Sequence, residues 1–281
     1  MKKLRLGSIR YVNSLPVDLG ILSGAISSPA EIIQGVPAQL NDRIAEGALD
    51  ISVVSAIWYA RRQKEFLLLP RLSISSKSGV QSVLLFSRRP ISELAGARIA
   101  VTAEGKTTPA LLEVLCRQRY GFKPEIYAAP GTLEIPSQAQ ALLVIGDDAL
   151  KARERFKNSD LVVTDLAEEW EKWTGLPFVF AVWVVRREVF DARPEALFEV
   201  HKALLTSKQW GLSHPEEVIR RAKEISALEK PLLESYFSGL SYDFDASLKK
   251  GMRAYFEQAE KCGLLEPVEE FEEIAHVSLR M

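Results

Sequence analysis

The sequence predicts an α/β protein with two lobes, each a mostly parallel sheet flanked by helices, and a helical C-terminal third. Short β-branched runs alternate with helical patterns through the first two thirds of the chain, which is typical of βαβ units. The run Phe178 to Val185 is apolar at every position and therefore fits a strand covered on both faces, in the middle of such a sheet. With 281 residues, the chain is long enough for one large or two medium domains.

The first unit is predicted to alternate strands and helices. The β-branched run ISVVS after Asp50 is typical of a buried strand, and Pro37 and Gly47 mark the start and stop of the helix before it. The first strand runs directly into a polar segment, residues 11–14, which makes its end a possible site. The predicted elements are, in order, strand 4–9, helix 37–46, strand 51–55, a helical stretch from residue 56 and strand 81–86.

A second unit begins at Arg98 with another strand, loop and helix. Pro109 in the first turn and Gly121 after the last one bound the helix that starts at Thr107. Its predicted elements are strand 98–102, helix 107–120, strands 141–145 and 161–164, and helices that begin near residues 147 and 165.

The apolar strand at 178–185 is expected to return the chain to the first unit. After it, helix signals predict helices over 194–212, 215–226, 230–237 and 244–261. We therefore expect a discontinuous first domain of residues 1–88 and 180–281, with residues 89–179 inserted as a second domain. Two crossings between two lobes imply a ligand cleft between them.

Composition and charge exclude several classes of protein. Lys and Arg total 36 against 37 Asp and Glu, so no broad basic field exists for nucleic acid. The longest uncharged apolar run, residues 176–185, is about half of what a membrane span needs. Polar residues interrupt the basic N-terminal segment, so it is not a signal peptide. Cys116 and Cys262 are not at metal-ligand spacing, which favours a reducing, cytoplasmic location.

Ligands of open α/β sheets bind beyond the carboxyl ends of strands, near helix N-termini. Four segments meet that description, and they contain Asn13 and Ser14, Ser55, Gly79 to Ser82 with Val80 and Gln81, and Thr107 with Thr108. They offer hydroxyls, an amide and backbone N–H groups. Such neutral donors suit a carboxylate, because they bind an anion without burying a counter-charge.

Each of these groups also has a structural explanation. Asn13 fits a turn, and Thr107 and Thr108 fit helix caps, whatever they bind. Ser82 is harder to explain by a structural role alone, because a hydroxyl in an apolar strand needs a partner. Lys106 is a secondary candidate that could pair with an anionic ligand.

Two further groups of titratable residues could have either a functional or a structural role. Asp147 and Asp148 form a carboxylate pair after strand 141–145 that could serve acid/base chemistry, although their position favours helix capping. The histidines lie in the helical C-terminal third with no spacing that places two on one face, so neither a metal site nor a catalytic histidine is expected there; they are His201, His214 and His276.

Several segments taken together carry a resemblance to a known family. They are IRYVNSLPV, VPAQLNDRIAEGALDISVVS, SGVQSVLLFS, VIGDDAL and WEKWTGLPFVFAVWVVR. The chain resembles, over essentially its whole length, the chorismate dehydratases of the futalosine route to menaquinone, which have the fold of type II periplasmic binding proteins. The resemblance implies catalytic roles for Asn13 and Ser82. Substrate contacts are expected from Ser14, Ser55, Gly79, Val80, Gln81, Thr107, Thr108, Gly146 and Asp147.

The resemblance implies a hydro-lyase that removes water from chorismate to give 3-[(1-carboxyvinyl)oxy]benzoate. No cofactor, metal, nucleic acid or membrane is expected to take part, and the protein is expected to be a monomer or homodimer. One alternative is the similar 1,4-dihydroxy-6-naphthoate synthase of the same pathway, which uses a histidine after the strand equivalent to 141–145. Here that position reads Gly146-Asp147-Asp148, which favours the dehydratase. The other alternative is a non-catalytic cytoplasmic protein that binds a small carboxylate.

Overall fold

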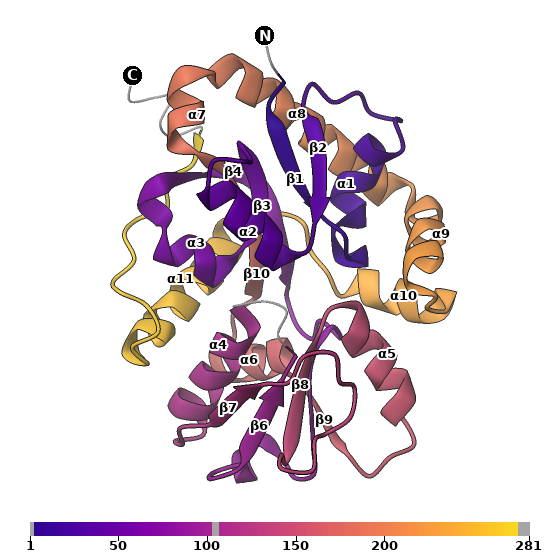
Figure 1. Ribbon diagram of the computed structural model, residues 1–281, viewed down its shortest axis with the longest axis vertical. Helices are drawn as coiled ribbons and strands as arrows, with labels where there is room; N and C mark the ends of the chain where they lie inside the picture. Colours follow the sequence, from indigo (N-terminus) through magenta and orange to yellow (C-terminus); the bar gives the residue numbers. More distant parts are fainter. Residues whose placement is uncertain (1–2, 103–106, 275–281) are drawn as a thin grey trace.

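Two five-stranded sheets form two lobes, one above the other in Figure 1. The computed structural model describes residues 3–102 and 107–274. The strands of the first sheet are β1 (Arg5–Ile9), β2 (Glu31–Gly35), β3 (Ile51–Ser55), β4 (Phe66–Ser76) and β10 (Phe178–Arg186), in the order β2-β1-β3-β10-β4. Those of the second are β5 (Val83–Ser87), β6 (Arg98–Val101), β7 (Glu125–Ala128), β8 (Ala141–Ile145) and β9 (Val162–Asp165), in the order β7-β6-β8-β5-β9.

Each sheet contains one strand that runs against the rest. In the first sheet β1 is parallel to β2 and β3, whereas β10 is antiparallel to both β3 and β4. In the second sheet β6 is parallel to β7 and β8, whereas β5 is antiparallel to β8 and β9. Four strands of each sheet therefore point the same way, which confirms the prediction of mostly parallel sheets. The apolar run at 178–185 lies between β3 and β4, as its burial on both faces requires.

The reversed strands, β5 and β10, are the first strands after the chain crosses between the lobes. β5 pairs within the second sheet, although the predicted boundary at residue 88 placed it in the first domain. A short apolar strand shows that it is buried but not which sheet buries it, so the sequence could not assign it. We therefore propose dividing the chain within the two connecting segments, 77–82 and 175–177.

Helices cover the faces of both sheets. They are α1 (Leu15–Leu22), α2 (Pro37–Ala45), α3 (Ala56–Arg61), α4 (Thr107–Val114), α5 (Asp147–Phe156), α6 (Leu166–Thr174), α7 (Arg187–Ala192), α8 (Pro194–Ser213), α9 (Pro215–Ser226), α10 (Lys230–Ser238) and α11 (Ala246–Lys261). α2, α3, α7 and α11 contact the first sheet, and α5 and α6 contact the second. The predicted C-terminal helices are confirmed within a few residues. No described helix has the length and apolar character of a membrane span.

Five of the described helices and strands were not predicted, namely α1, β2, β4, β7 and α7. α1 matters most for the site, because it starts directly after the turn that carries Asn13 and packs along α8. The two helices approach closely at Gly211, where a Cβ atom would lie 2.2 Å from the carbonyl oxygen of Pro16. A residue larger than glycine would therefore push α1 away from α8 and disturb the turn.

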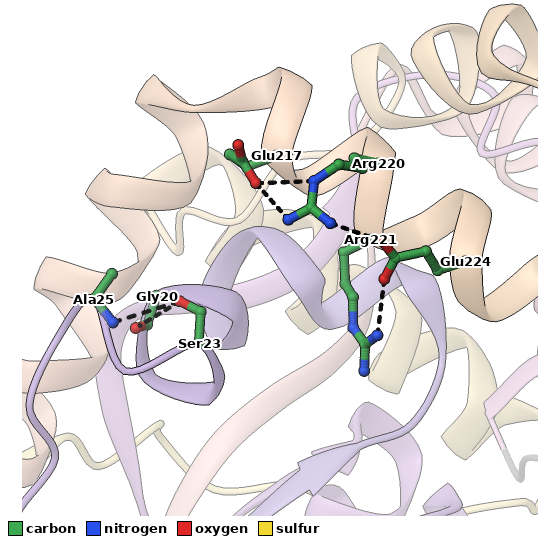
Figure 2. A network of polar contacts seen from close by, with 7 residues as sticks. All are labelled: Gly20, Ser23, Ala25, Glu217, Arg220, Arg221 and Glu224. Atoms are coloured by element: carbon green, nitrogen blue, oxygen red, sulfur yellow. Dashed lines mark hydrogen bonds and ion pairs between the residues drawn. The ribbon is translucent and has the colours of Figure 1, made fainter.

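The outer face of α9 carries a network of ion pairs (Figure 2). Arg220 binds Glu217 at 2.7 Å and Glu224 at 2.6 Å, and Arg221 binds Glu224 at 2.9 Å. All of these side chains are exposed, so each pair contributes little to stability. This surface is therefore a solvated helix face.

Candidate functional site

A cavity lies between the lobes and takes its walls from both. The volume of the cavity is about 80 Å³. Its polar lining residues are Tyr11, Asn13, Ser55, Ser82, Thr107, Thr108, Gly146 and Tyr236, and its apolar lining residues are Ile9, Pro37, Ile74, Val80, Val83, Ile145, Phe180, Ala181 and Leu240. Such a mixed lining suits a small molecule that carries both polar and apolar groups.

Most of the residues predicted from the sequence meet in this cavity. They are Asn13, Ser55, Val80, Ser82, Thr107, Thr108 and Gly146. Oδ1 of Asn13 and Oγ of Ser55 are buried and have no hydrogen-bond partner among the described residues. Buried polar atoms almost always have a partner, so a bound molecule would supply the missing one. Asn13 lies in the turn after β1, and Ser55 ends β3, at the carboxyl edge of the first sheet.

Ser82 is paired with a tyrosine that the sequence analysis did not select. The hydroxyl of Tyr236 donates to Oγ of Ser82 at 3.1 Å, and both side chains are buried. Burial raises the pKa of Tyr236, so its phenol stays protonated and remains a donor. Because Ser82 accepts this bond, its own proton is left to donate to a ligand. No motif marks Tyr236, since it lies on a helix of ordinary composition far along the chain.

Thr107 joins the second lobe to the first. Its Oγ1 accepts a hydrogen bond from the backbone N–H of Ile57 at 3.3 Å, at the start of α3. Its carbonyl oxygen accepts another from the hydroxyl of Tyr255 on α11 at 3.0 Å. Thr107 and Thr108 are both buried at the start of α4 and line the cavity. The secondary candidate Lys106 lies outside the described residues.

Ser14 does not line the cavity. Its hydroxyl donates to the carbonyl oxygen of Ile9 at 2.9 Å, so it closes the turn that holds Asn13. The prediction that it contacts a ligand is therefore replaced by a supporting role.

The crossover segment, residues 77–82, contains backbone N–H groups that were predicted to bind a ligand but donate to other atoms of the protein. The N–H groups of Val80 and Gln81 both donate to Oδ2 of Asp165, at 2.8 and 2.6 Å, so neither is free for a substrate carboxylate. Gly79 and Gln81 lie outside the cavity, and the Gln81 amide binds Ser235 on α10. Only the side chains of Val80 and Ser82 reach the cavity from this segment.

Asp147 and Asp148 are not helix caps. The N-cap of α5 is Gly146, whose φ of 70° and ψ of −147° few other residues adopt, and both aspartates lie in the first turn after it. Oδ1 of Asp147 accepts a hydrogen bond from the N–H of Val12 at 3.4 Å, across the lobes. The interpretation as caps was wrong because the glycine already occupies that position.

The described lining of the cavity combines helix N-termini with uncharged side chains. None of the described residues that line it is charged at neutral pH. Instead α2 and α4 begin at Pro37 and Thr107, and α3 and α5 begin after Ser55 and Gly146, so four helix N-termini lie at the described lining. Their free N–H groups and dipoles favour negative charge.

The described histidines lie elsewhere. Nε2 of His201 lies 2.9 Å from the carbonyl oxygen of Pro70, and burial lowers the pKa of His201. His214 stacks on Trp210. Their structural roles agree with the interpretation of the sequence, and His276 lies outside the described residues.

Comparisons with solved structures show the fold. A protein from Archaeoglobus fulgidus superimposes with a TM-score of 0.76 at 20% identity, covering 94% of this chain and 98% of its own. The alkanesulfonate-binding protein of Xanthomonas axonopodis superimposes with a TM-score of 0.69 at 15% identity, covering 98% and 97%. A periplasmic aliphatic sulphonate binding protein of Escherichia coli and a Candida albicans protein with the generic periplasmic binding protein fold also superimpose, with TM-scores of 0.65 and 0.68, so the predicted fold class is confirmed.

Comparisons with curated sequences show the family. The chain is 31% identical to a chorismate dehydratase of Thermus thermophilus over 92% of this chain and 95% of that one. It is 28% identical to a 1,4-dihydroxy-6-naphthoate synthase of the same organism over 95% and 97%. A sequence model of the family described as "Menaquinone biosynthesis" matches residues 4–261. The chain therefore belongs to the menaquinone biosynthesis family.

Proposed function

We propose that this protein is a chorismate dehydratase, which removes water from chorismate to give 3-[(1-carboxyvinyl)oxy]benzoate. The observation that carries the proposal is the inter-lobe cavity, in which neutral donors and helix N-termini surround two unpartnered oxygens, Asn13 Oδ1 and Ser55 Oγ. Such a site suits a dianion with a ring and a hydroxyl group. The identity to the curated dehydratase supports the same reaction.

The reaction needs a base, a leaving hydroxyl and a fixed ring. The enolpyruvyl carboxylate of chorismate takes the proton from the ring carbon that bears the ether, the C–H electrons form the ring double bond, and hydroxide leaves the adjacent carbon. The same proton then converts hydroxide into water. This route agrees with a cavity whose described lining contains no carboxylate or histidine to act as base.

The side chains of the cavity would orient these groups. Oδ1 of Asn13 accepts from the leaving hydroxyl, which its unpartnered state favours. Ser82, itself bound by Tyr236, donates to a substrate carboxylate, and Ser55 supplies another donor. Catalysis then consists mainly of holding the dianion in a reactive conformation away from water, between lobes that close on it.

The alternatives differ from this proposal in their products. A synthase of the second relative's kind would not act on chorismate, and the described cavity lining contains no histidine of the kind expected for it. A non-catalytic receptor would bind chorismate and leave it intact. We also propose a cytosolic location, because Cys116 and Cys262 are both free thiols. The oligomeric state, monomer or homodimer, stays a prediction.

Incubation of the purified protein with chorismate tests the proposal. We expect chorismate to disappear and 3-[(1-carboxyvinyl)oxy]benzoate to form with turnover, identified by chromatography and mass spectrometry against a sample without protein. A complex that protects chorismate without a new aromatic product would favour the receptor. No binding and no turnover would reject both.

A further inference from the structure

The carboxylate of Asp165 joins the crossover segment to a helix of the second lobe. Its Oδ1 accepts from the N–H groups of Ala167 and Glu168, at 3.0 and 3.3 Å, and so caps α6. Its Oδ2 accepts from the N–H groups of Val80 and Gln81, at 2.8 and 2.6 Å. One side chain therefore satisfies four backbone donors from two distant segments, and only two of them belong to its own helix.

The backbone of the crossover segment packs closely against this carboxylate. A Cβ atom on Gly79 would lie 3.2 Å from Oδ2 of Asp165, so only glycine allows this approach without a shift. Gln81 has a φ of 61°, in the left-handed region that costs a non-glycine residue free energy. The two bonds to Asp165 compensate for a backbone conformation that Gln81 would not adopt alone.

This conformation sets the direction of the next residue. Ser82 follows Gln81 directly, its side chain lines the cavity, and its carbonyl oxygen accepts from the N–H of Gly146 at 2.8 Å. If the peptide bond between Gln81 and Ser82 flipped, the Ser82 hydroxyl would leave the cavity and lose its hydrogen bond with Tyr236.

We propose that Asp165 is a positioning residue, which holds Gln81 in the left-handed conformation so that the Ser82 hydroxyl faces the substrate. The inference rests on the proposed function, because it assumes that Ser82 contacts the substrate. Asp165 itself does not line the cavity. It acts on the reaction only through the backbone of the crossover segment.

The variant Asp165→Asn separates this role from helix capping. Asparagine caps a helix as well as aspartate, but its amide has one acceptor oxygen and cannot accept four N–H groups on two sides. We expect kcat/KM for chorismate to fall at least tenfold at a temperature where circular dichroism shows the variant folded. The matched control is Asp245→Asn, at the exposed N-cap of α11, whose Oδ1 binds only Leu248 of its own helix. It should keep wild-type kcat/KM, and equal values for the two variants would overturn the proposal.

A second pair of variants tests the left-handed conformation itself. Glycine adopts a φ near 61° without cost, whereas alanine does not, and both remove the Gln81 side chain. In the Asp165→Asn background, Gln81→Gly should therefore give a kcat/KM at least threefold above that of Gln81→Ala. Equal values would show that the conformation of residue 81 does not carry the effect. If Asp165→Asn does not fold, Gly79→Ala replaces it, because it displaces the crossover and leaves the cap of α6 intact; unchanged kcat/KM there would contradict the proposal.

Amide hydrogen exchange distinguishes failure of this inference from failure of the proposed function. Asp165→Asn should speed exchange at Val80 and Gln81 relative to the wild type, measured by NMR without any ligand. If wild-type protein does not convert chorismate, the proposed function and the role of Asp165 in it both fail, while faster exchange would still show that the carboxylate holds the segment. If chorismate is converted and exchange is unchanged in the variant, only the positioning role is rejected.

Discussion

Oδ1 of Asn13 and Oγ of Ser55 are buried without a hydrogen-bond partner among the described residues, which is costly unless a ligand completes them. Leaving a buried polar atom unpaired costs about 1–3 kcal/mol. Both residues line one cavity, and Ser82 and Tyr236, whose hydroxyls are paired, line it as well. A substrate hydroxyl or carboxylate that binds there would supply the missing hydrogen-bond partners.

Removing either of the two proposed catalytic side chains should slow turnover. We expect Asn13→Ala and Ser82→Ala each to lower kcat/KM for chorismate by about 100-fold, because each removes one preorganised hydrogen bond to the substrate. Asn158→Ala and Ser159→Ala are matched controls, because both residues are exposed on the loop after α5. Values within about threefold of the wild type, or about 0.7 kcal/mol, would reject the assignments.

Tyr236 should act through Ser82. Tyr236→Phe removes the hydroxyl that donates to Ser82 at 3.1 Å and keeps the aromatic ring in its hydrophobic cluster. We expect kcat/KM to fall by about three- to tenfold, because a neutral hydrogen bond contributes about 0.5–1.5 kcal/mol. The same substitution in a Ser82→Ala background should have little further effect. Additive losses in the double variant would show that Tyr236 acts independently of Ser82.

The sequence could predict the residues whose type and place both indicate a site. Asn13, Ser55 and Thr107 stand at strand ends or helix starts, where ligands of α/β sheets bind, and they do line the cavity. Gln81 stands at an equally suitable place, yet Asp165 takes its N–H. Which partner a donor finds depends on tertiary contacts, and these lie far apart in sequence.

At the scale of elements, α1 carries a buried acid against β1. Burial raises the pKa of Asp18 to about 6, against the opposing hydrogen bond from the hydroxyl of Ser8 at 2.7 Å. The native state then binds the proton more tightly than the unfolded chain, so protonated Asp18 favours folding at low pH. This contribution is fully present below about pH 4 and is lost as the pH rises through about 6.

Urea unfolding of the wild type and Asp18→Asn at about pH 4 and pH 7 tests this assignment. Relative to the variant, the wild type should lose about 2 kcal/mol of unfolding free energy between the two values. Asparagine cannot ionise, so the variant lacks this part of the pH dependence. Parallel pH profiles for the two proteins would contradict the assignment.

The contact between α1 and α8 depends on Gly211. Gly211→Ala places a Cβ atom 2.2 Å from the carbonyl oxygen of Pro16, so we expect a loss of about 1–3 kcal/mol of unfolding free energy. Alanine normally stabilises a helix relative to glycine, so a decrease in unfolding free energy would itself indicate the close contact with α1. Thr206→Ala, on the exposed side of α8, should be nearly neutral in the same urea titration. A stabilised Gly211→Ala variant would show that α1 does not pack as described.

Elements with a clear period or clear end signals could be predicted, and the others could not. α2 was recognised from Pro37 and Gly47, and β10 from its unbroken apolar run. α1 was missed because it is buried on most sides and apolar except for Asp18, which hides the helical period. β4 was missed because Pro70 and the left-handed Arg71 interrupt it, and its pairing with β10 contains register shifts.

For the whole molecule, hydrogen bonds join the two lobes. Thr107 binds Ile57 and Tyr255, and Asp147 binds Val12, so these bonds hold the second lobe against the first. These few bonds are weak enough to exchange as a ligand enters, since each contributes about 1 kcal/mol. The sequence predicted two lobes and a cleft, but it could not show which strand ends meet across it.

A crystal structure with 3-[(1-carboxyvinyl)oxy]benzoate bound tests the central claim most directly. The account predicts the ring between the lobes, one carboxylate within hydrogen-bond distance of Ser82 Oγ, and Asn13 beside the ring carbon that carried the hydroxyl in chorismate. A product molecule bound outside the inter-lobe cavity, or in it with neither Asn13 nor Ser82 in contact, would contradict the account.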